Sequence, residues 1–208
     1  MKKRFIFDLD GTMLSGDYSI EHEYFYDVFG NKAVKFNHNI PKYLDQYENS
    51  HIKYEKDLLS HFLSKKSGLP FNEDIIDGWI EYVGLMKDKY EEDVFEVPDY
   101  LKTKGNSVVC LTNWFEKTQK NRLMRSGIID YLDDLYTGDV LLKPHKEAYY
   151  QAMGDYPIEE CVFIGDNVEK DYIGPRCLGM ESILYDKGNK HSDYLVKIKR
   201  LNKIMDIY

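Results

Sequence analysis

Two aspartates near the start of the chain are the first residues that could do chemistry. Asp8 and Asp10 follow the apolar run at residues 5–7, and on an extended backbone side chains two positions apart leave on the same side. Gly11 comes next and permits a sharp turn. A carboxylate pair at a strand end offers the hard oxygen ligands that suit Mg²⁺. It can also divide phosphoryl transfer between a nucleophile, which forms an aspartyl-phosphate, and a group that moves protons.

Two other interpretations compete for this stretch. A calcium-binding EF-hand loop also begins with aspartates at this spacing, but it needs Gly at its sixth position and Glu at its twelfth. Here Gly11 is fourth and Ser19 is twelfth, so the sequence does not match that loop. A plain acidic turn after a strand stays open when residues 5–12 are considered alone.

Polar residues also follow the apolar run at residues 107–111. A hydroxyl and backbone N–H groups of Thr112 and Asn113 could hold phosphate oxygens, although such a pair is usually a helix cap. Lys143 precedes Pro144, which starts a predicted helix. A lysine in that place is ordinarily a surface residue. In a phosphate site it would offset the charge of the nucleophile and of the transferring group.

A second pair of carboxylates follows the apolar run at residues 161–164. Asp166 falls at the end of this predicted strand and Asp171 in the first turn of the next helix. Five residues apart, they would not share a face of a regular helix. They can converge only if the loop between them folds back, which Gly165 would ease. The alternative is that Asp166 or Asn167 merely caps the helix, but four polar groups closing different strands are hard to explain as independent caps.

The four groups together resemble the motifs of the haloacid dehalogenase-like hydrolases. The resemblance covers the whole chain, and the motifs occur in the family's order: DLDGT at 8–12, the Thr112 position, Lys143 with its following proline, and GDNVEKD at 165–171. The segment inserted between the first two motifs resembles the family's helical cap of the first type.

This resemblance implies roles for the aspartates of the first motif. Asp8 would be the nucleophile and a Mg²⁺ ligand. Asp10 would be the general acid and base, and its backbone carbonyl would bind the metal. Family members that cleave carbon–halogen bonds lack the second aspartate and need no metal, so the presence of Asp10 argues against dehalogenation.

The resemblance also assigns the remaining motif residues. Thr112 would bind the phosphoryl group, with Asn113 beside it, and Lys143 would neutralise charge on Asp8 and on that group. Asp166 would ligate Mg²⁺ directly, and Asp171 would complete the acidic site outside the ring of direct ligands.

The predicted activity is Mg²⁺-dependent hydrolysis of a small phosphate monoester. A β-phosphoglucomutase-like phosphotransferase would use the same core and return the phosphoryl group to a sugar hydroxyl, and the motifs do not separate the two. A receiver-like signalling domain also combines acids, Thr and Lys around Mg²⁺, but such domains are compact and uncapped. A scaffold that has lost catalysis is a third alternative, and no feature of the sequence favours it.

Strands and helices alternate in the part of the chain that carries these motifs. Strands are predicted at 4–7, 107–111, 161–164 and 182–185, with a weaker one at 135–136, and helices at 98–104, 114–126, after Pro144, and 168–178. This alternation predicts an α/β fold with a Rossmann-like parallel sheet. Ligands of such sheets bind beyond the carboxyl ends of the strands, where every motif falls.

Residues 15–95 are predicted to be helical rather than alternating strand and helix. They lack convincing strands and carry aromatic and charged residues at helical spacing, as in 52–65 and 73–90. We expect a helical cap domain at 15–95 and an α/β catalytic core at 1–14 and 96–208, since apolar helix faces need something to pack on. Tyr18 and His22, near the first linker, could face a substrate.

The C-terminal tail is expected to add a strand at 194–196 and a closing helix with Leu201, Ile204 and Met205 on one face. Lysines 197, 199 and 203 and Arg200 are expected to form a solvated helix face.

Composition restricts the partners. The chain has 208 residues, of which 43% are hydrophobic and 31% charged, and a net charge of −8. That charge argues against nucleic acid and anionic membranes as partners, but not against a small phosphorylated metabolite. No stretch is long and apolar enough for a signal peptide or a membrane span. Three widely spaced cysteines, without a CxxC pair, suggest reduced thiols and a cytoplasmic protein. The oligomeric state is not predicted.

Overall fold

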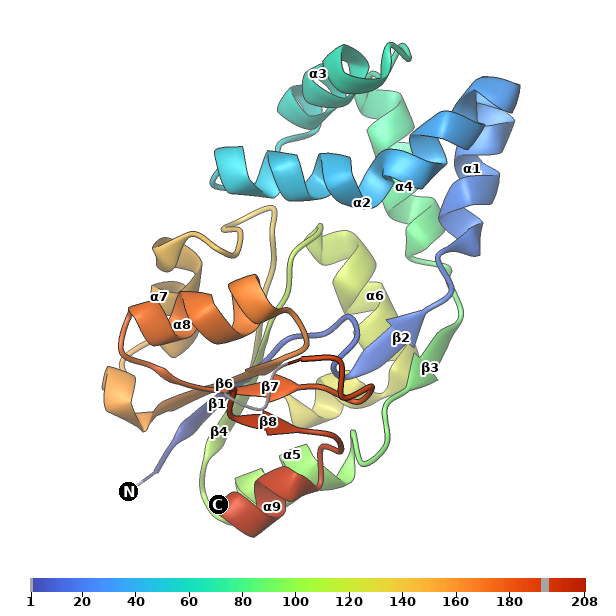
Figure 1. The fold of residues 1–208 in the computed structure, drawn as a ribbon. Coiled ribbons are helices and arrows are strands. Elements are labelled where there is room, and N and C mark those ends of the chain that lie inside the picture. The colour runs from blue at the N-terminus through green and yellow to red at the C-terminus, as the bar shows by residue number, and fades with distance from the viewer. Residues whose placement is uncertain (1, 192–194) are drawn as a thin grey trace.

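The computed structural model describes residues 2–191 and 195–208 (Figure 1). Within them, six strands form one sheet in the order β5-β4-β1-β6-β7-β8, and every neighbouring pair is parallel. The strands are β1 (Arg4–Phe7), β4 (Ser107–Leu111), β5 (Asp134–Tyr136), β6 (Cys161–Gly165), β7 (Glu181–Tyr185) and β8 (Lys197–Ile198). The predicted Rossmann-like α/β fold is confirmed.

Both faces of this sheet are covered by helices, because the buried strands are apolar on both sides. Phe5 and Phe7 of β1 pack in one cluster with residues of α5 (Glu96–Thr103), α6 (Glu116–Ser126) and α9 (Lys203–Ile207). Ile6, between them, packs on the opposite face with residues of α7 (Lys146–Met153). This two-residue alternation explains why the central strand is apolar throughout. Figure 1 shows α8 (Gly174–Cys177) beside α7.

Four helices follow the first strand and pack around one hydrophobic cluster, which also includes Phe115 and Leu142 from the sheet region. They are α1 (Ser19–Phe29), α2 (Ala33–Ser50), α3 (Lys56–Ser67) and α4 (Glu73–Val83), with a short 3₁₀ turn, η1 (Gly30–Lys32). The aromatic side chains Phe25, Phe36 and Trp79 are buried among them. Figure 1 shows these helices lying over the carboxyl ends of the central strands. We call α1–α4 the helical cap.

Two short strands connect the helical cap to the sheet, and the sequence did not predict them. β2 (Leu14–Gly16) leads into the cap and β3 (Asp88–Tyr90) leads out, and they pair antiparallel. The predicted helix at 73–90 is therefore too long: α4 ends at Val83, where Gly84 follows. The backbone bonds between the two linker strands replace helical ones over 88–90.

The C-terminal tail differs in register from the prediction. The strand expected at 194–196 is found at Lys197–Ile198, and Tyr194 lies outside the described residues. Leu201 and Ile204 are buried and Met205 packs beside them, as predicted. The prediction of a solvated face is wrong for Lys197, which lies on a strand and forms an ion pair with Asp186 at 3.2 Å. Three shorter turns complete the fold: η2 (Ile128–Tyr131), η3 (Ile158–Glu160) and η4 (Val168–Ile173).

Candidate active site

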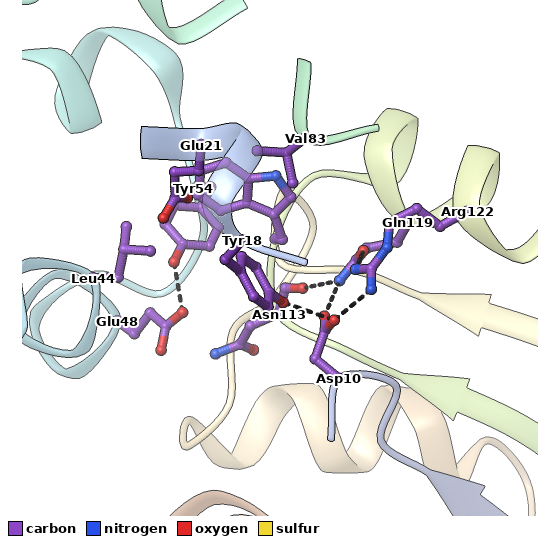
Figure 2. A pocket seen from close by; sticks show the side chains of 11 residues that line it. Asp10, Tyr18, Glu21, Leu44, Glu48, Tyr54, Val83, Asn113, Gln119 and Arg122 are labelled. Atoms are coloured by element: carbon purple, nitrogen blue, oxygen red, sulfur yellow. Dashed lines mark hydrogen bonds and ion pairs between the residues drawn. The ribbon is translucent and has the colours of Figure 1, made fainter. Parts of the chain in front are cut away.

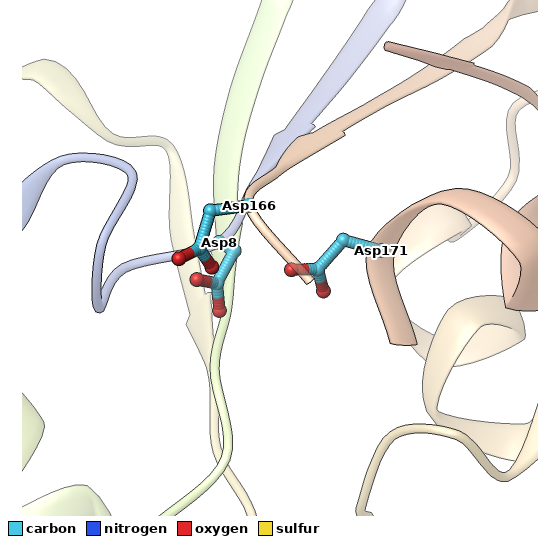
Figure 3. Close-up of side chains that lie close together, drawn as sticks. All are labelled: Asp8, Asp166 and Asp171. Atoms are coloured by element: carbon cyan, nitrogen blue, oxygen red, sulfur yellow. The ribbon is translucent and has the colours of Figure 1, made fainter. Parts of the chain in front are cut away.

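Three carboxylates meet at the carboxyl end of the sheet. Asp8 follows β1 and Asp166 follows β6, its neighbour in the sheet, while Asp171 reaches in from η4. One oxygen from each of the three lies within 4.8 Å of the others. Figure 3 shows Asp171 facing the other two carboxylates from the helical side. The adjacency of β1 and β6 thus unites residues that are more than 150 positions apart in the sequence.

Two glycines make this convergence possible. Gly11 has a φ of +82°, and a Cβ there would lie 2.3 Å from Oδ2 of Asp166. A Cβ at Gly165 would lie 2.4 Å from the carboxyl group of Asp171. Both distances are far shorter than van der Waals contact, so a side chain at either position would displace a carboxylate of the cluster.

The loop between Asp166 and Asp171 folds back, as the sequence suggested. Residues 168–173 form a single π-helical turn, and Asn167 caps it by accepting hydrogen bonds from the N–H groups of Glu169 and Lys170, each at 3.0 Å. The Asn167 N–H in turn donates to Oδ2 of Asp171 at 3.0 Å. The capping interpretation is therefore right for Asn167, and the cap itself positions Asp171.

Lys143 supplies the positive charge of the cluster. Its ammonium donates to Oδ1 of Asp8 at 2.6 Å and to Oδ1 of Asp171 at 2.7 Å. The residue is 2% exposed, and the two carboxylates hold its pKa above the usual range even though burial opposes this. The ordinary expectation of a surface lysine does not apply here.

The cluster still carries more negative than positive charge. Burial raises the pKa of Asp8 well above its usual value, and Asp171 and Asp166 raise it further against the opposing effect of Lys143. Although Asp166 keeps contact with solvent, desolvation and the neighbouring Asp171 raise its pKa to about 6. One ammonium facing three carboxylates leaves room for a cation, and carboxylate oxygens are what Mg²⁺ prefers. The residues present therefore fit the expected metal.

Asp10 is placed differently from the other aspartates. β1 ends at Phe7, so the alternation of an extended strand no longer governs residue 10. Arg122 reaches its Oδ1 at 2.7 Å and Gln119 its Oδ2 at 2.9 Å. Burial would raise the pKa of Asp10, but these contacts outweigh it and hold that pKa below the usual range. The expected pair with Asp8 is thus found only in part: both line one pocket, but their carboxylates have different partners.

Thr112 and Asn113 follow β4 and line the pocket that contains Asp8. The Thr112 hydroxyl is buried and accepts from Nε2 of Gln119 at 3.0 Å. The Asn113 side chain is bonded to the backbone of a neighbouring segment. It exchanges two hydrogen bonds with the backbone of Lys143, at 2.9 and 3.0 Å, and so fixes the position of that lysine.

A second pocket adjoins the first on the side of the helical cap (Figure 2). It shares Asp10, Glu48 and Asn113 with the pocket around Asp8. The Tyr18 hydroxyl donates to Oδ1 of Asp10 at 2.8 Å, so one of the two cap residues expected to face a substrate does lie here. The other, His22, does not line either pocket and is exposed.

The residues that sequence reasoning missed in this second pocket come mainly from the helical cap and from α6. Their sequence contexts resemble ordinary helix faces, and the only regularity is the three-residue spacing of Gln119 and Arg122. The missed lining residues are Glu21, Leu44, Glu48, Tyr54, Val83, Trp114, Gln119 and Arg122.

Comparison with known families decides the identification. The family model described as haloacid dehalogenase-like hydrolase matches residues 2–179. The chain belongs to this family. The match spans all four motifs, so the family assigned from them is confirmed.

Among curated proteins, this haloacid dehalogenase-like hydrolase is similar to a glyceraldehyde 3-phosphate phosphatase of Methanocaldococcus jannaschii, with 31% identity over 118 residues, 51% of each chain. It is also similar to a phosphoserine phosphatase of Thermus thermophilus, with 27% identity over 96 residues, 44% of this chain and 39% of the other. The chain spans about half or less of the length of the curated relatives it matches.

Solved structures extend the likeness of this hydrolase to the whole fold. A HAD hydrolase of Bacillus subtilis bound to magnesium superposes with a TM-score of 0.72 and 17% identity, covering 99% of this chain and 98% of that chain. The L-2-haloacid dehalogenase of Xanthobacter autotrophicus gives a TM-score of 0.72 and 13% identity, covering 100% and 98%. At these identities the likeness concerns the fold alone.

Proposed function

We propose that the chain is a Mg²⁺-dependent phosphatase that hydrolyses a small phosphate monoester through an aspartyl-phosphate on Asp8. One observation carries the proposal: the ammonium of buried Lys143 bridges Asp8 and Asp171, with Asp166 in the same cluster. A carboxylate nucleophile, a fixed positive charge and free capacity for a cation are what phosphoryl transfer needs in one place. The curated relatives named as phosphatases support phosphate-ester hydrolysis rather than dehalogenation as the reaction.

In the first half-reaction, an oxygen of Asp8 attacks phosphorus while the bond from phosphorus to the leaving oxygen breaks. Lys143 stabilises the charge on Asp8 and on the phosphoryl oxygens. The buried hydroxyl of Thr112 and the backbone N–H of Asn113 bind the phosphoryl group. Asp10 lies where the pocket around Asp8 meets the second pocket. Because its pKa is low in the free site, it must take up a proton as the anionic ester binds, and it then passes that proton to the leaving alkoxide.

In the second half-reaction, water attacks phosphorus of the aspartyl-phosphate and the bond to the Asp8 oxygen breaks. Asp10 takes the proton of that water, which restores its first protonation state and regenerates the Asp8 carboxylate. Inorganic phosphate is the product. The same intermediate passed to a sugar hydroxyl would be the phosphotransferase alternative, and no contact of the described residues favours it.

Asp8 and Asp166, with the backbone carbonyl of Asp10, would hold the metal, and Asp171 would support them from its contact with Lys143. When bound, Mg²⁺ would supply positive charge that offsets the phosphoryl oxygens.

We also propose that residues 15–95 act as a lid over this site in a cytoplasmic enzyme. Glu48 of α2 accepts hydrogen bonds from Tyr54 and from Lys170, which belongs to the Asp166–Asp171 loop. A cap held to the catalytic loop in this way would exclude bulk water and select the leaving group. In the described residues, no helix is long and apolar enough to cross a membrane, and the three cysteines carry free thiols.

The test is hydrolysis of p-nitrophenyl phosphate with and without Mg²⁺, by the wild type and by Asp8→Asn. We expect Mg²⁺-dependent release of phosphate that is lost in Asp8→Asn. Asp130→Asn, which removes an exposed carboxylate outside both pockets, serves as the matched control. Full activity in Asp8→Asn would show that the nucleophile is misassigned.

A further inference from the structure

The second pocket lies where the leaving group of a phosphate ester must go. Its empty space amounts to about 480 Å³ with the open solvent at its mouth included, and it begins at Asp10. Asp8 lines only the adjoining pocket, so a phosphoryl group at Asp8 would direct its ester oxygen past Asp10 into this space. We call it the leaving-group pocket.

The charged groups of the leaving-group pocket are not balanced. Arg122 is the cation among its lining residues, and its guanidinium is already bound to Asp10 at 2.7 Å and to Asp88 of β3 at 2.6 Å. Glu48 is paired with Lys170. Neither of these two charges is therefore available to a ligand without breaking an existing ion pair.

Glu21 is the exception. It is 7% exposed, and Nε1 of Trp79 donates to its Oε2 at 2.9 Å. Among residues 2–191 and 195–208, no cation lies within ion-pair distance of this carboxylate. Burial raises the pKa of Glu21 to about 7. A buried acid without a counter-ion costs stability, and such a group in a cleft is a candidate for ligand binding.

Aromatic rings stand around the same space. Tyr54 and Trp114 both line it, with ring centroids 5.3 Å apart, and Trp79 lies 4.5 Å from Trp114. Tyr18 forms the wall next to Asp10 in Figure 2. The faces of aromatic rings attract cations, most strongly where water is excluded. Rings and an uncompensated carboxylate are therefore combined in one small cavity.

We propose that the leaving-group pocket binds an alcohol that carries a protonated or quaternary nitrogen, with Glu21 as its counter-ion and the rings of Tyr54, Trp114 and Tyr18 around it. The substrate class is then the phosphate monoester of an amino alcohol. This inference rests on the proposed function for its catalytic part, but binding of the alcohol does not depend on it.

The same charges disfavour acidic leaving groups. A carboxylate in the leaving-group pocket would meet Glu21 and Glu48, and the guanidinium of Arg122 is already shared between two aspartates. Like charges in a site of low dielectric repel strongly. Phosphoserine and phosphoglycolate are therefore expected to be poorer substrates than phosphoethanolamine or phosphocholine.

Tryptophan fluorescence tests binding of the alcohol independently of catalysis. The chain contains two tryptophans. Trp114 lines this pocket, and Trp79 lies behind its wall, in contact with Glu21 and Trp114. We expect choline to change the emission saturably, with an affinity at least tenfold higher than that of 3,3-dimethylbutan-1-ol, its neutral isostere, at constant ionic strength. Equal affinities, or no saturable change with choline, would overturn the proposal whether or not the chain is a phosphatase.

Variants of α1 sharpen the test. Glu21→Gln keeps the shape and an acceptor for Trp79 but removes the charge, so we expect the preference for choline over its isostere to fall at least tenfold. Glu23→Gln removes an exposed charge from the same helix and should keep that preference.

The same comparison can be made with catalysis, as the ratio of kcat/KM for phosphocholine to kcat/KM for 3,3-dimethylbutyl phosphate. An unchanged preference in Glu21→Gln would contradict the assigned counter-ion. Failure of the Asp8→Asn test, by contrast, would leave the fluorescence result standing.

Discussion

Nη2 of Arg122 lies 2.7 Å from Oδ1 of Asp10. Because the same nitrogen lies 2.6 Å from Oδ1 of Asp88, this guanidinium joins a proposed catalytic aspartate to the strand that leaves the helical cap. Arg122 is 1% exposed. The position of Asp10 is therefore tied to the linker between cap and sheet.

We expect Arg122→Gln to lower kcat by about 10- to 100-fold, because an unanchored Asp10 would transfer protons less efficiently. Removing one partner of a buried ion pair also costs about 3–5 kcal/mol, so the melting temperature should fall as well. Arg122→Lys should recover part of the stability but little of the rate, since one ammonium cannot reproduce the forked geometry.

The matched control is Arg125→Gln on the same helix. Arg125 donates to the backbone carbonyl of Gly84 at 2.9 Å and also contacts the linker, but it does not touch Asp10. Steady-state kinetics and thermal melts of the three variants check the expectation. Equal losses of kcat in Arg122→Gln and Arg125→Gln would mean that the linker, and not the Asp10 contact, matters.

Gly11→Ala should disrupt the acidic cluster. The added Cβ would lie 2.3 Å from Asp166, so that carboxylate must move, and we expect Mg²⁺ affinity measured by calorimetry to fall at least tenfold. Gly127→Ala is the control, because its φ of +76° carries the same backbone strain with no atom within 4 Å of the new Cβ. The control should lose about 1 kcal/mol of stability and keep its metal affinity. Normal Mg²⁺ binding in Gly11→Ala would argue against Asp166 as a ligand.

Lys143→Met should make the fold depend on the divalent ion. Without the ammonium, Asp8 and Asp171 would lose their buried counter-charge, which costs about 3–5 kcal/mol. Thermal melts in EDTA should show this loss, and Mg²⁺ should raise the melting temperature of the variant more than that of the wild type. Activity should fall on the order of 10²–10³-fold. Lys146→Met, an exposed lysine three residues on, is the control. An unchanged melting temperature in EDTA would contradict the structural part of this role.

Glu21 should make the wild type less stable as the pH rises. Its pKa is about 7 in the folded chain against an ordinary 4.5, so the folded state holds an extra proton between these values. Stability therefore falls as pH rises from about 4.5 to about 7. Glu21→Gln has no carboxyl group at this position to titrate. Its unfolding free energy relative to that of the wild type should therefore rise by on the order of 3 kcal/mol between pH 4.5 and pH 8.

Chemical denaturation at several pH values measures that difference. The nearby Tyr18 and Tyr54 do not titrate in this range, because burial and neighbouring carboxylates raise the pKa of both. Asp10 and Glu48, the other acids of the pocket, are present in both proteins and cancel in the comparison. A constant difference across the range would mean that Glu21 is not held in a desolvated site.

Much of the fold and of the acidic cluster was predictable from local patterns. An apolar run followed by a polar residue specifies a buried strand and its carboxyl end, and parallel strands bring all such ends to one edge. Asp8, Thr112 and Asp166 were placed in this way, and the resemblance to the family's motifs added Lys143 and Asp171. All five line one pocket.

The linker strands, the partners of Asp10 and the leaving-group pocket were not predictable in this way. β2 and β3 are three residues each, and they are stabilised by pairing with each other across more than 70 residues of chain. Neither three-residue segment, taken alone, has a pattern that indicates a strand. Glu21 lies on α1, Arg122 on α6 and Trp114 on the loop before α6, and their roles arise only where those segments meet. Short-range periodicity thus determined the sheet and the ends of its strands, whereas long-range packing between cap and sheet decided what surrounds the substrate.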